Sequence, residues 1–302
     1  KIFATAVNRS NLDVKIENFK IYGAASKDSV LTKTLAYNKS IDFAVDTKIP
    51  GNVAITQPYW LNEKPEKGIY KVQEEIFRGL PMAPDALWAE FTLNILGVSL
   101  KYTHPIKYKY TEPSIGEIYK YLEIRPEIML NLDQKVYIFA DNKPKKVGVM
   151  VKSNIANNST KVKLNLAAGW NYEPKEIEVN FTEKNQEKPV FFTVTPPTNS
   201  SETEIKALAS TANGTFSKSL KNVKYEHIPE LNVFPEATAK ANRINLLKKG
   251  QNIVYIAGAG DEVPESLKQI GYDLTNLNET TIKGNLTKYD AIIVGVRAYN
   301  TE

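Results

Sequence analysis

Two histidines, His104 and His227, are the first residues to consider for metal chemistry, because the sequence contains no cysteine. Without cysteine the chain has no thiol nucleophile, no disulfide and no thiolate ligand for a metal. A catalytic zinc takes three side-chain ligands and keeps a fourth position open for water. Neither histidine has a second ligand at metal-binding spacing. We therefore expect structural roles for both and no metal site in this chain.

A second candidate is the glycine-containing stretch NIVYIAGAGDEVPESLKQIGYD at residues 252–273. An apolar run leads into Gly258 and Gly260, and apolar residues then recur at helical spacing, which predicts a strand, a turn and a helix. A dinucleotide-binding loop requires a third glycine where this sequence has Val263, and the Gly-Lys-Ser/Thr motif of a Walker loop is missing. We expect a structural turn, with Asp261 as the helix N-cap and as a charge that would compete with phosphate.

A second apolar run follows this helix, at residues 291–294. A continuously apolar strand is typical of a central parallel strand that is covered on both faces. Residues 251–302 therefore predict the first part of a doubly wound α/β domain. Such folds bind ligands beyond the carboxyl ends of their strands, where Asp261, Arg297 and Tyr299 are the candidate ligand-binding residues. Arg297 suits a carboxylate or a phosphate, and a structural ion pair is the alternative.

Aromatic side chains offer a third kind of chemistry, because their apolar ring faces can stack on sugar rings. Tyr59, Trp60 and Trp170 are the candidate carbohydrate-stacking residues. The alternative is a structural role, since β-sandwiches commonly bury a tryptophan between their sheets. The sequence leaves both interpretations open.

The composition limits the partners of the chain. Its 302 residues exceed the roughly 100 to 200 of a typical domain, so two or three domains are expected. The 39 basic and 34 acidic residues give a net charge of +5, yet the two signs are interspersed, which argues against a nucleic-acid partner. No apolar run approaches the roughly 20 residues that a membrane-spanning helix requires, so no membrane span is expected.

Residues 1–228 consist of short alternating runs, such as LDVKIENFKIY and STKVKLNLAAGW, separated by turn residues. Period-two alternation rich in Val, Ile, Thr, Phe and Tyr is typical of antiparallel sandwiches. A plan of strand, Asn/Ser-rich turn and strand begins at Ala6 and again at Val151, which indicates two related domains. The predicted fold class is mainly β: an immunoglobulin-like sandwich at 1–120, a second at 121–228, a linker at 229–250 and an incomplete α/β domain at 251–302.

The segment VMVKSNIANNSTKVKLNLAAGWNYEPKEIEVNF, with the later KPVFFTVTPP, resembles the immunoglobulin-like modules found beside carbohydrate-active enzymes. The first sandwich adds AITQPYWL, KGIYKV and HPIKYKYTEPSIGEIYKYLEIRP. Together with NIVYIAGAGDEVPESLKQIGYDLTNLN and YDAIIVGVRAYNT, these segments resemble the C-terminal region of multidomain PIG-L (LmbE-like) deacetylases of Bacteroidetes type. Residues 251–302 are similar to the start of a glutamine-amidotransferase-like (ThuA-like) domain. The resemblance covers nearly the whole chain, and the motifs that carry it are structural ones.

The resemblance implies a parent enzyme that uses zinc to hydrolyse N-acetyl groups of amino sugars or related glycoconjugates. Enzymes of that family carry an N-terminal His-Pro-Asp-Asp motif, in which a second Asp acts as base on the zinc-bound water. Here His104 and Pro105 are followed by Ile106 and Lys107, so the motif is missing. The zinc and its catalytic domain would precede this region in a bacterial protein that is periplasmic, secreted or part of the cell envelope.

The sequence therefore predicts a non-catalytic accessory region without catalytic residues, metal or cofactor of its own. Its expected partners are its own catalytic domain and a glycan. The alternative is a stand-alone carbohydrate-binding or scaffold protein of the cell envelope. A third hypothesis is a small-ligand site in the α/β domain, centred on Asp261 and Arg297. Exposed coplanar aromatics on a sandwich face would favour the second hypothesis, and a closed pocket at the strand ends the third.

Overall fold

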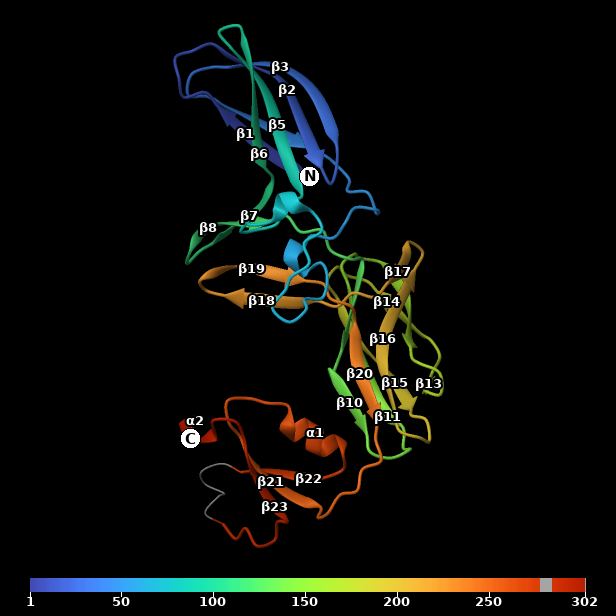
Figure 1. Cartoon of the computed structure of the whole chain (residues 1–302). Helices are drawn as coiled ribbons and strands as arrows, with labels where there is room; N and C mark the ends of the chain where they lie inside the picture. Colours follow the sequence, from blue (N-terminus) through green and yellow to red (C-terminus); the bar gives the residue numbers. More distant parts are fainter. Residues whose placement is uncertain (278–283, 302) are drawn as a thin grey trace. The chain divides into compact units, whose positions relative to one another are not determined.

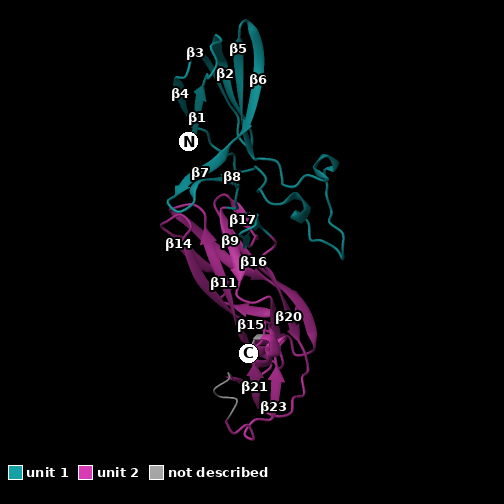
Figure 2. Ribbon diagram, turned by 90° about the vertical axis from the view of Figure 1, so that its left-hand side faces the viewer, with its two compact units in different colours: residues 1–126, 221–234 teal, residues 127–220, 235–302 magenta. Residues whose placement is uncertain are grey.

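The structure is a computed structural model that describes residues 1–277 and 284–301. Strands dominate it, arranged mainly in antiparallel sheets (Figure 1). Two compact units divide the chain: unit 1 contains residues 1–126 and 221–234, and unit 2 contains residues 127–220 and 235–302 (Figure 2). The mainly β class predicted from the alternating sequence is confirmed.

Unit 1 contains two antiparallel sheets that share a hydrophobic core. The larger sheet has the strand order β3-β2-β5-β6, and the smaller pairs β1 with β4. The buried ring of Phe19, on β2, lies 4.8 Å from the Phe91 ring and 6.1 Å from the Phe43 ring of β4, which joins the two sheets. The strands are β1 (Ile2–Val7), β2 (Val14–Gly23), β3 (Lys27–Leu35), β4 (Ser40–Val45), β5 (Leu87–Ile95) and β6 (Val98–Pro105).

Residues 46–86, all of which the structure describes, connect β4 to β5 without a strand. They contain two short 3-10 helices, η1 (Tyr59–Leu61) and η2 (Glu75–Phe77). The Tyr59 and Phe77 rings pack 5.9 Å apart, so the two helices contact each other. Long connections without regular structure are uncommon in compact domains and are often functional.

Two hairpins that are distant in sequence complete unit 1. The first pairs β7 (Lys107–Glu112) with β8 (Gly116–Tyr121), and the second pairs β18 (Lys221–Tyr225) with β19 (Ile228–Val233). Lys120 Nζ on β8 lies 2.7 Å from Glu230 Oε2 on β19. This ion pair helps to attach the second hairpin to unit 1, although the chain between the hairpins belongs to unit 2.

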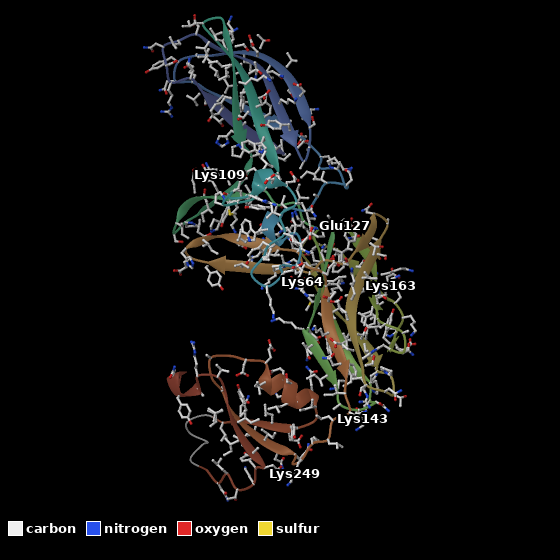
Figure 3. All side chains as sticks on the ribbon, in the orientation of Figure 1. Lys64, Lys109, Glu127, Lys143, Lys163 and Lys249 are labelled. Atoms are coloured by element: carbon white, nitrogen blue, oxygen red, sulfur yellow. The ribbon has the colours of Figure 1, made fainter. Side chains whose placement is uncertain are left out.

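Lysine and tyrosine alternate along β7 and β8, so that lysines of one strand lie beside tyrosines of the other. Lys109, labelled in Figure 3, has its Nζ 5.5 Å from the centre of the Tyr119 ring and 2.5 Å from Glu117 Oε1. Lys107 Nζ lies 4.7 Å from the Tyr121 ring centre. Cation–π contacts of this kind stabilise a two-stranded ribbon that has little core of its own.

Unit 2 contains two further sheets around a single core. One has the order β10-β20-β16-β12-β14, with β17 paired to β16, and the other has the order β13-β15-β11-β9. Fully buried Phe139 and Ile205 of the first sheet belong to the same core as Val149 and Phe192 of the second. The strands are β9 (Ile128–Leu132), β10 (Val136–Phe139), β11 (Lys145–Ser153), β12 (Asn158–Asn165), β13 (Asn171–Glu173), β14 (Ile177–Phe181), β15 (Glu187–Thr195), β16 (Ser201–Thr211), β17 (Gly214–Phe216) and β20 (Thr238–Arg243).

The boundaries of these units differ from those expected for a second sandwich at 121–228 and a linker at 229–250. The expected linker contains most of β19 and all of β20, which pairs with both β16 and β10. Strand β20 reads TAKANR, and its buried apolar residues are the alanines Ala237 before it and Ala239 and Ala241 within it. Alanine gives a weak alternation signal, because its apolar side chain is small, so the strand resembles a polar linker in sequence.

A three-stranded parallel sheet, β22-β21-β23, follows in unit 2. Helix α1 (Val263–Gln269) connects β21 (Asn252–Ile256) to β22 (Asp273–Leu277), and α2 (Ala298–Thr301) follows β23 (Ala291–Val294). Among the described residues β21 holds the centre of this sheet and β23 an edge, so the apolar run at 291–294 does not occupy the central position expected for it. Among the described residues, no helix is long and apolar enough to cross a membrane.

An ion cluster just before β20 is expected to make the stability of unit 2 depend on pH. The Glu236 carboxylate lies 2.8 Å from Lys206 Nζ and 2.7 Å from Lys218 Nζ, and it accepts a 2.8 Å hydrogen bond from Ser217 Oγ. Burial by itself raises the pKa of Glu236, but these three donors outweigh it and lower the pKa to about 2, from 4.5. Because the folded pKa lies below the unfolded one, the cluster stabilises unit 2 above pH 4.5, and this stability is lost as the pH falls toward about 2.

We therefore expect Glu236→Gln to flatten the loss of unit 2 stability between pH 4.5 and about 2, the window between the two pKa values. An acid titration followed by circular dichroism, combined with hydrogen exchange in β16 and β20, measures this. Glu202→Gln removes a carboxylate from the exposed side of β16. It should keep the acid-induced loss of the wild type, and equal behaviour of the two variants would contradict the assignment to Glu236.

Candidate functional site

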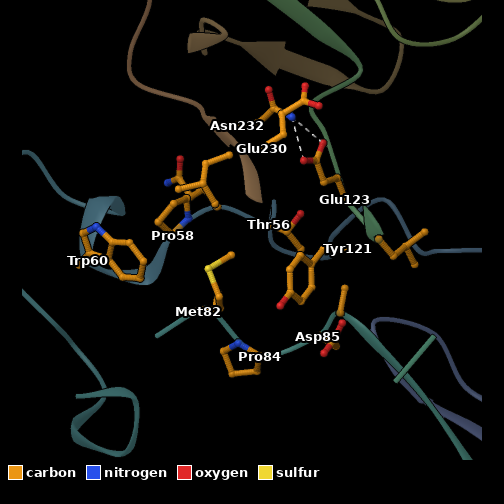
Figure 4. Close-up of a pocket in the computed structure, with 15 residues that line it drawn as sticks. Thr56, Pro58, Trp60, Met82, Pro84, Asp85, Tyr121, Glu123, Glu230 and Asn232 are labelled. Carbon is orange, nitrogen blue, oxygen red and sulfur yellow. Dashed lines mark hydrogen bonds between the residues drawn. The ribbon is translucent and has the colours of Figure 1, made fainter. Parts of the chain in front are cut away.

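Unit 1 contains a pocket formed by three segments: the 46–86 connection, the end of β8 with the residues after it, and β19 (Figure 4). Its volume is about 520 Å³, including the space open to solvent at its mouth. The lining residues are Thr56, Gln57, Pro58, Trp60, Met82, Ala83, Pro84, Asp85, Ala86, Tyr121, Leu122, Glu123, Glu230, Leu231 and Asn232.

Apolar and aromatic side chains form most of the pocket wall. In the view of Figure 4, Met82 lies between the Trp60 ring and the Tyr121 ring. Tyr59 fixes Trp60, because its ring packs edge-on against the indole at 4.9 Å and its hydroxyl donates a 3.0 Å hydrogen bond to the Leu80 carbonyl. Of the predicted stacking residues, Trp60 thus lines the pocket, and Tyr59 holds the Trp60 ring in position.

Polar side chains of the wall are already held by the protein. Asn232 Nδ2 donates to both oxygens of Glu123, at 2.8 and 2.9 Å, as the dashed lines in Figure 4 mark. Arg125 donates two further hydrogen bonds to Glu123 Oε2, at 2.6 and 2.8 Å. Gln57 Oε1 accepts a 2.8 Å hydrogen bond from the Phe234 amide. These bonds orient the amides and carboxylates before any ligand arrives, which lowers the entropy cost of binding.

Two more carboxylates line the pocket in different electrostatic states. Burial raises the pKa of Asp85, against the opposing effect of nearby Lys107 and His104. Hydrogen bonds from Lys120 and Asn222 lower the pKa of Glu230, so this carboxylate remains ionised at neutral pH. With Glu123 there are three carboxylates in the lining, and the lining contains no lysine or arginine.

The two histidines lie apart from any metal-binding geometry in the described residues. His104 is exposed on β6, with Nδ1 2.8 Å from the Pro105 carbonyl oxygen. His227 lies in the turn of the β18–β19 hairpin, with its ring 5.9 Å from that of Tyr225. Among residues 1–277 and 284–301, no three His, Asp or Glu side chains gather closely enough to hold a metal ion.

The glycine turn brings two loops of the parallel sheet into direct contact. The Ala259 amide donates a 2.8 Å hydrogen bond to the Val296 carbonyl. A Cβ atom on Gly258 would lie 2.2 Å from that same oxygen, so only glycine fits. Gly258 thus serves chain packing, in agreement with the expected structural turn.

Asp261 uses its carboxylate to fasten these loops together. It accepts hydrogen bonds from the Tyr255 hydroxyl at 2.6 Å, the Val263 amide at 3.0 Å and the Val296 amide at 3.4 Å. The Tyr255 hydrogen bond is the largest cause of the lowered pKa of Asp261. Asp261 accepts a hydrogen bond from the first amide of the helix, that of Val263, as predicted, but the N-cap position itself belongs to the next residue, Glu262.

Arg297 and Tyr299 follow β23, near the loop that Asp261 fastens. Arg297 is exposed and adopts a left-handed backbone conformation with φ of 56°. Tyr299 is exposed on α2. The Val296 amide, which precedes Arg297 in the chain, donates a hydrogen bond to Asp261, so the backbone beside Arg297 lies close to this carboxylate. None of these three candidate residues lines the pocket of unit 1.

Trp170, the third predicted stacking residue, is buried in the core of unit 2, with 8% of its surface exposed. Its ring lies edge-on to Phe139 at 5.1 Å, and Nε1 donates a 3.2 Å hydrogen bond to Ser201 Oγ. The stacking hypothesis is wrong for Trp170, because the ring faces that a sugar would need are covered.

Sequence reasoning missed most of the pocket residues. Tyr121 and Glu123 lie at and just after the end of β8, whereas Glu230 and Asn232 lie on β19, far away in the chain. A weak signal exists in the tyrosines of YKYLEI, which predict an exposed ribbon. No local pattern in the sequence pairs that ribbon with β19.

No protein-family model and no curated protein sequence matches this chain. Among solved structures, it is similar to WR4, a member of the MSP family from C. elegans. The two share 12% identity over 38% of this chain and 98% of the WR4 chain, with a TM-score of 0.24. A TM-score this low supports no inference about the present chain.

Proposed function

We propose that this chain is a non-catalytic accessory region that binds carbohydrate in the pocket of unit 1. The observation that carries this proposal is the combination of an aromatic wall, from Trp60 and Tyr121, with the pre-positioned pair of Asn232 and Glu123. Sugar rings present apolar C–H faces and polar hydroxyl edges, so a sugar site needs both kinds of group. Ligand sites of this kind are concave, mostly apolar and carry a few fixed polar groups.

The resemblance to PIG-L (LmbE-like) deacetylases provides the proposed context. In this context the sheet pairs of units 1 and 2 are immunoglobulin-like sandwiches, and residues 251–302 begin an amidotransferase-like α/β domain. The shared core of each sheet pair and the parallel order β22-β21-β23 support this assignment. The accessory region would hold a glycan near a zinc-dependent catalytic domain of the same exported protein.

A stand-alone carbohydrate-binding or scaffold protein of the cell envelope is the second candidate. It is favoured by the fact that all lining residues of the pocket lie within unit 1, so the site needs no other domain. Zinc-dependent release of acetate from N-acetylglucosamine oligomers by the full-length protein would support the deacetylase context. Glycan binding without such hydrolysis would support the second candidate.

Trp60→Ala tests the glycan site directly. We expect it to weaken binding to the best ligand of a glycan array by about tenfold or more, equivalent to about 1.4 kcal/mol, because a stacked ring face is lost. Isothermal titration calorimetry measures this change. Tyr102→Ala is the matched control, because Tyr102 is an exposed aromatic of unit 1 outside the pocket. If both variants bind as the wild type does, the pocket is not the glycan site.

A further inference from the structure

We infer that the pocket of unit 1 prefers a sugar with a free, protonated amino group over the N-acetylated form of the same sugar. This inference rests on the proposed carbohydrate binding and specifies its ligand class. It follows from the charge of the lining, from the position of its ion-pair partners and from the aromatic wall.

The charged side chains that line the pocket are all acidic. Asp85, Glu123 and Glu230 contribute carboxylates to the wall, and the lining contains no lysine or arginine. An anionic sugar would meet unfavourable charges there, and a cationic sugar favourable ones. Since the wall is largely apolar, each of these interactions is screened less than in open water.

The basic partners of these carboxylates lie outside the lining. Glu123 pairs with Arg125 at 2.6 Å, and Glu230 pairs with Lys120 at 2.7 Å. The glutamate side chains are 25% and 28% exposed, and their partners are 34% and 45% exposed. Both glutamates are thus less exposed than their basic partners, and a carboxylate can accept further hydrogen bonds beyond those it already makes.

The aromatic wall adds a second attraction for a cation. Trp60 lines the pocket, and an ammonium group within about 6 Å of its ring centre would be held by the negative ring face. The Tyr121 ring also lines the pocket and already has Lys107 Nζ 4.7 Å from its centre. A neutral acetamido group loses this attraction and the attraction to the carboxylates. An ammonium group at the polar edge of a sugar, beside its apolar C–H face, would satisfy both features of the wall.

The test compares oligomers of glucosamine with N-acetylglucosamine oligomers of equal length, titrated calorimetrically into the whole chain. We expect the glucosamine oligomers to bind about tenfold tighter or more at low salt, and this advantage to shrink as salt is added. Equal or tighter binding of the N-acetylated oligomers, still sensitive to Trp60→Ala, would overturn the amine preference and leave the glycan site intact. Binding of neither oligomer would overturn both proposals.

Charge variants separate the pocket from general electrostatic attraction. Glu230→Gln should lower the affinity for glucosamine oligomers about threefold to tenfold, because a carboxylate of the pocket wall becomes neutral. Glu112→Gln removes an exposed carboxylate of β7 outside the pocket and should leave the affinity unchanged. Circular dichroism confirms that each variant is folded. Equal losses in Glu230→Gln and Glu112→Gln would overturn the inference, because binding would then follow net charge alone.

Discussion

Trp170→Ala is expected to destabilise unit 2 by about 3–5 kcal/mol, the usual cost of removing a buried aromatic side chain. The loss has two parts. The Trp170 ring packs edge-on against Phe139 in the core, and its Nε1 donates to Ser201 Oγ at 3.2 Å. Truncation leaves a cavity between the sheets and a hydroxyl without its donor. Trp170→Phe keeps most of the ring volume and loses the hydrogen bond, so it should cost about 1–3 kcal/mol.

Hydrogen exchange measured by mass spectrometry is the suitable readout, because a chain with two units need not unfold in one transition. We expect faster exchange in β15 and β16 of the Trp170→Ala variant and unchanged exchange in β2 and β5 of unit 1. Glycan binding should equal that of the wild type, in contrast to Trp60→Ala. Unchanged exchange together with lost glycan binding would restore Trp170 as a sugar-stacking residue.

Gly258→Ala is expected to destabilise the parallel sheet of unit 2 by about 1–3 kcal/mol or more, the range for overpacking a closely packed site. The added Cβ would lie 2.2 Å from the Val296 carbonyl oxygen, which is a backbone atom and cannot rotate away. Relief requires the two loops to separate, which would break the hydrogen bond between the Ala259 amide and the Val296 carbonyl. Hydrogen exchange in β21 and β23 should therefore accelerate.

Gly260→Ala is the matched control for this prediction. Gly260 has a positive φ of 96° and open space where a Cβ would stand, so alanine there meets backbone strain without a clash. We expect a smaller loss, of about 1 kcal/mol. If Gly258→Ala exchanges like the wild type, the loops have room between them, and a ligand at this turn becomes a viable interpretation again.

The alternating sequence predicts the strands well, because a strand that is buried on one face has an apolar residue at every second position. It predicts the order of strand, turn and helix at 252–273 for the same local reason. It does not predict that β21 is central and β23 is at the edge, because an apolar run records burial without naming the neighbour. The sequence does not reveal strand β20, because the buried apolar residues of this strand are alanines.

The residues of the candidate site illustrate the same limit. Tyr59 and Trp60 were predicted as stacking residues from their type alone, and the structure places them in and beside the pocket. Trp170 has the same type and lies in a core. The residues next to Trp170 in the sequence do not distinguish a core tryptophan from a pocket tryptophan. Whether an aromatic ring is exposed depends on which distant segments of the chain pack against it.

The sequence by itself determined the mainly β character of the chain, the turn chemistry at Gly258 and the absence of cysteine chemistry. Only the tertiary structure decided that residues 221–234 join unit 1, and thereby that Glu230 and Asn232 complete a pocket with Trp60 and Tyr121. The physical reason is the range of the interactions involved. Alternation and turns follow from neighbours within a few residues, whereas the pocket depends on long-range contacts such as Asn232 to Glu123, which no local pattern encodes.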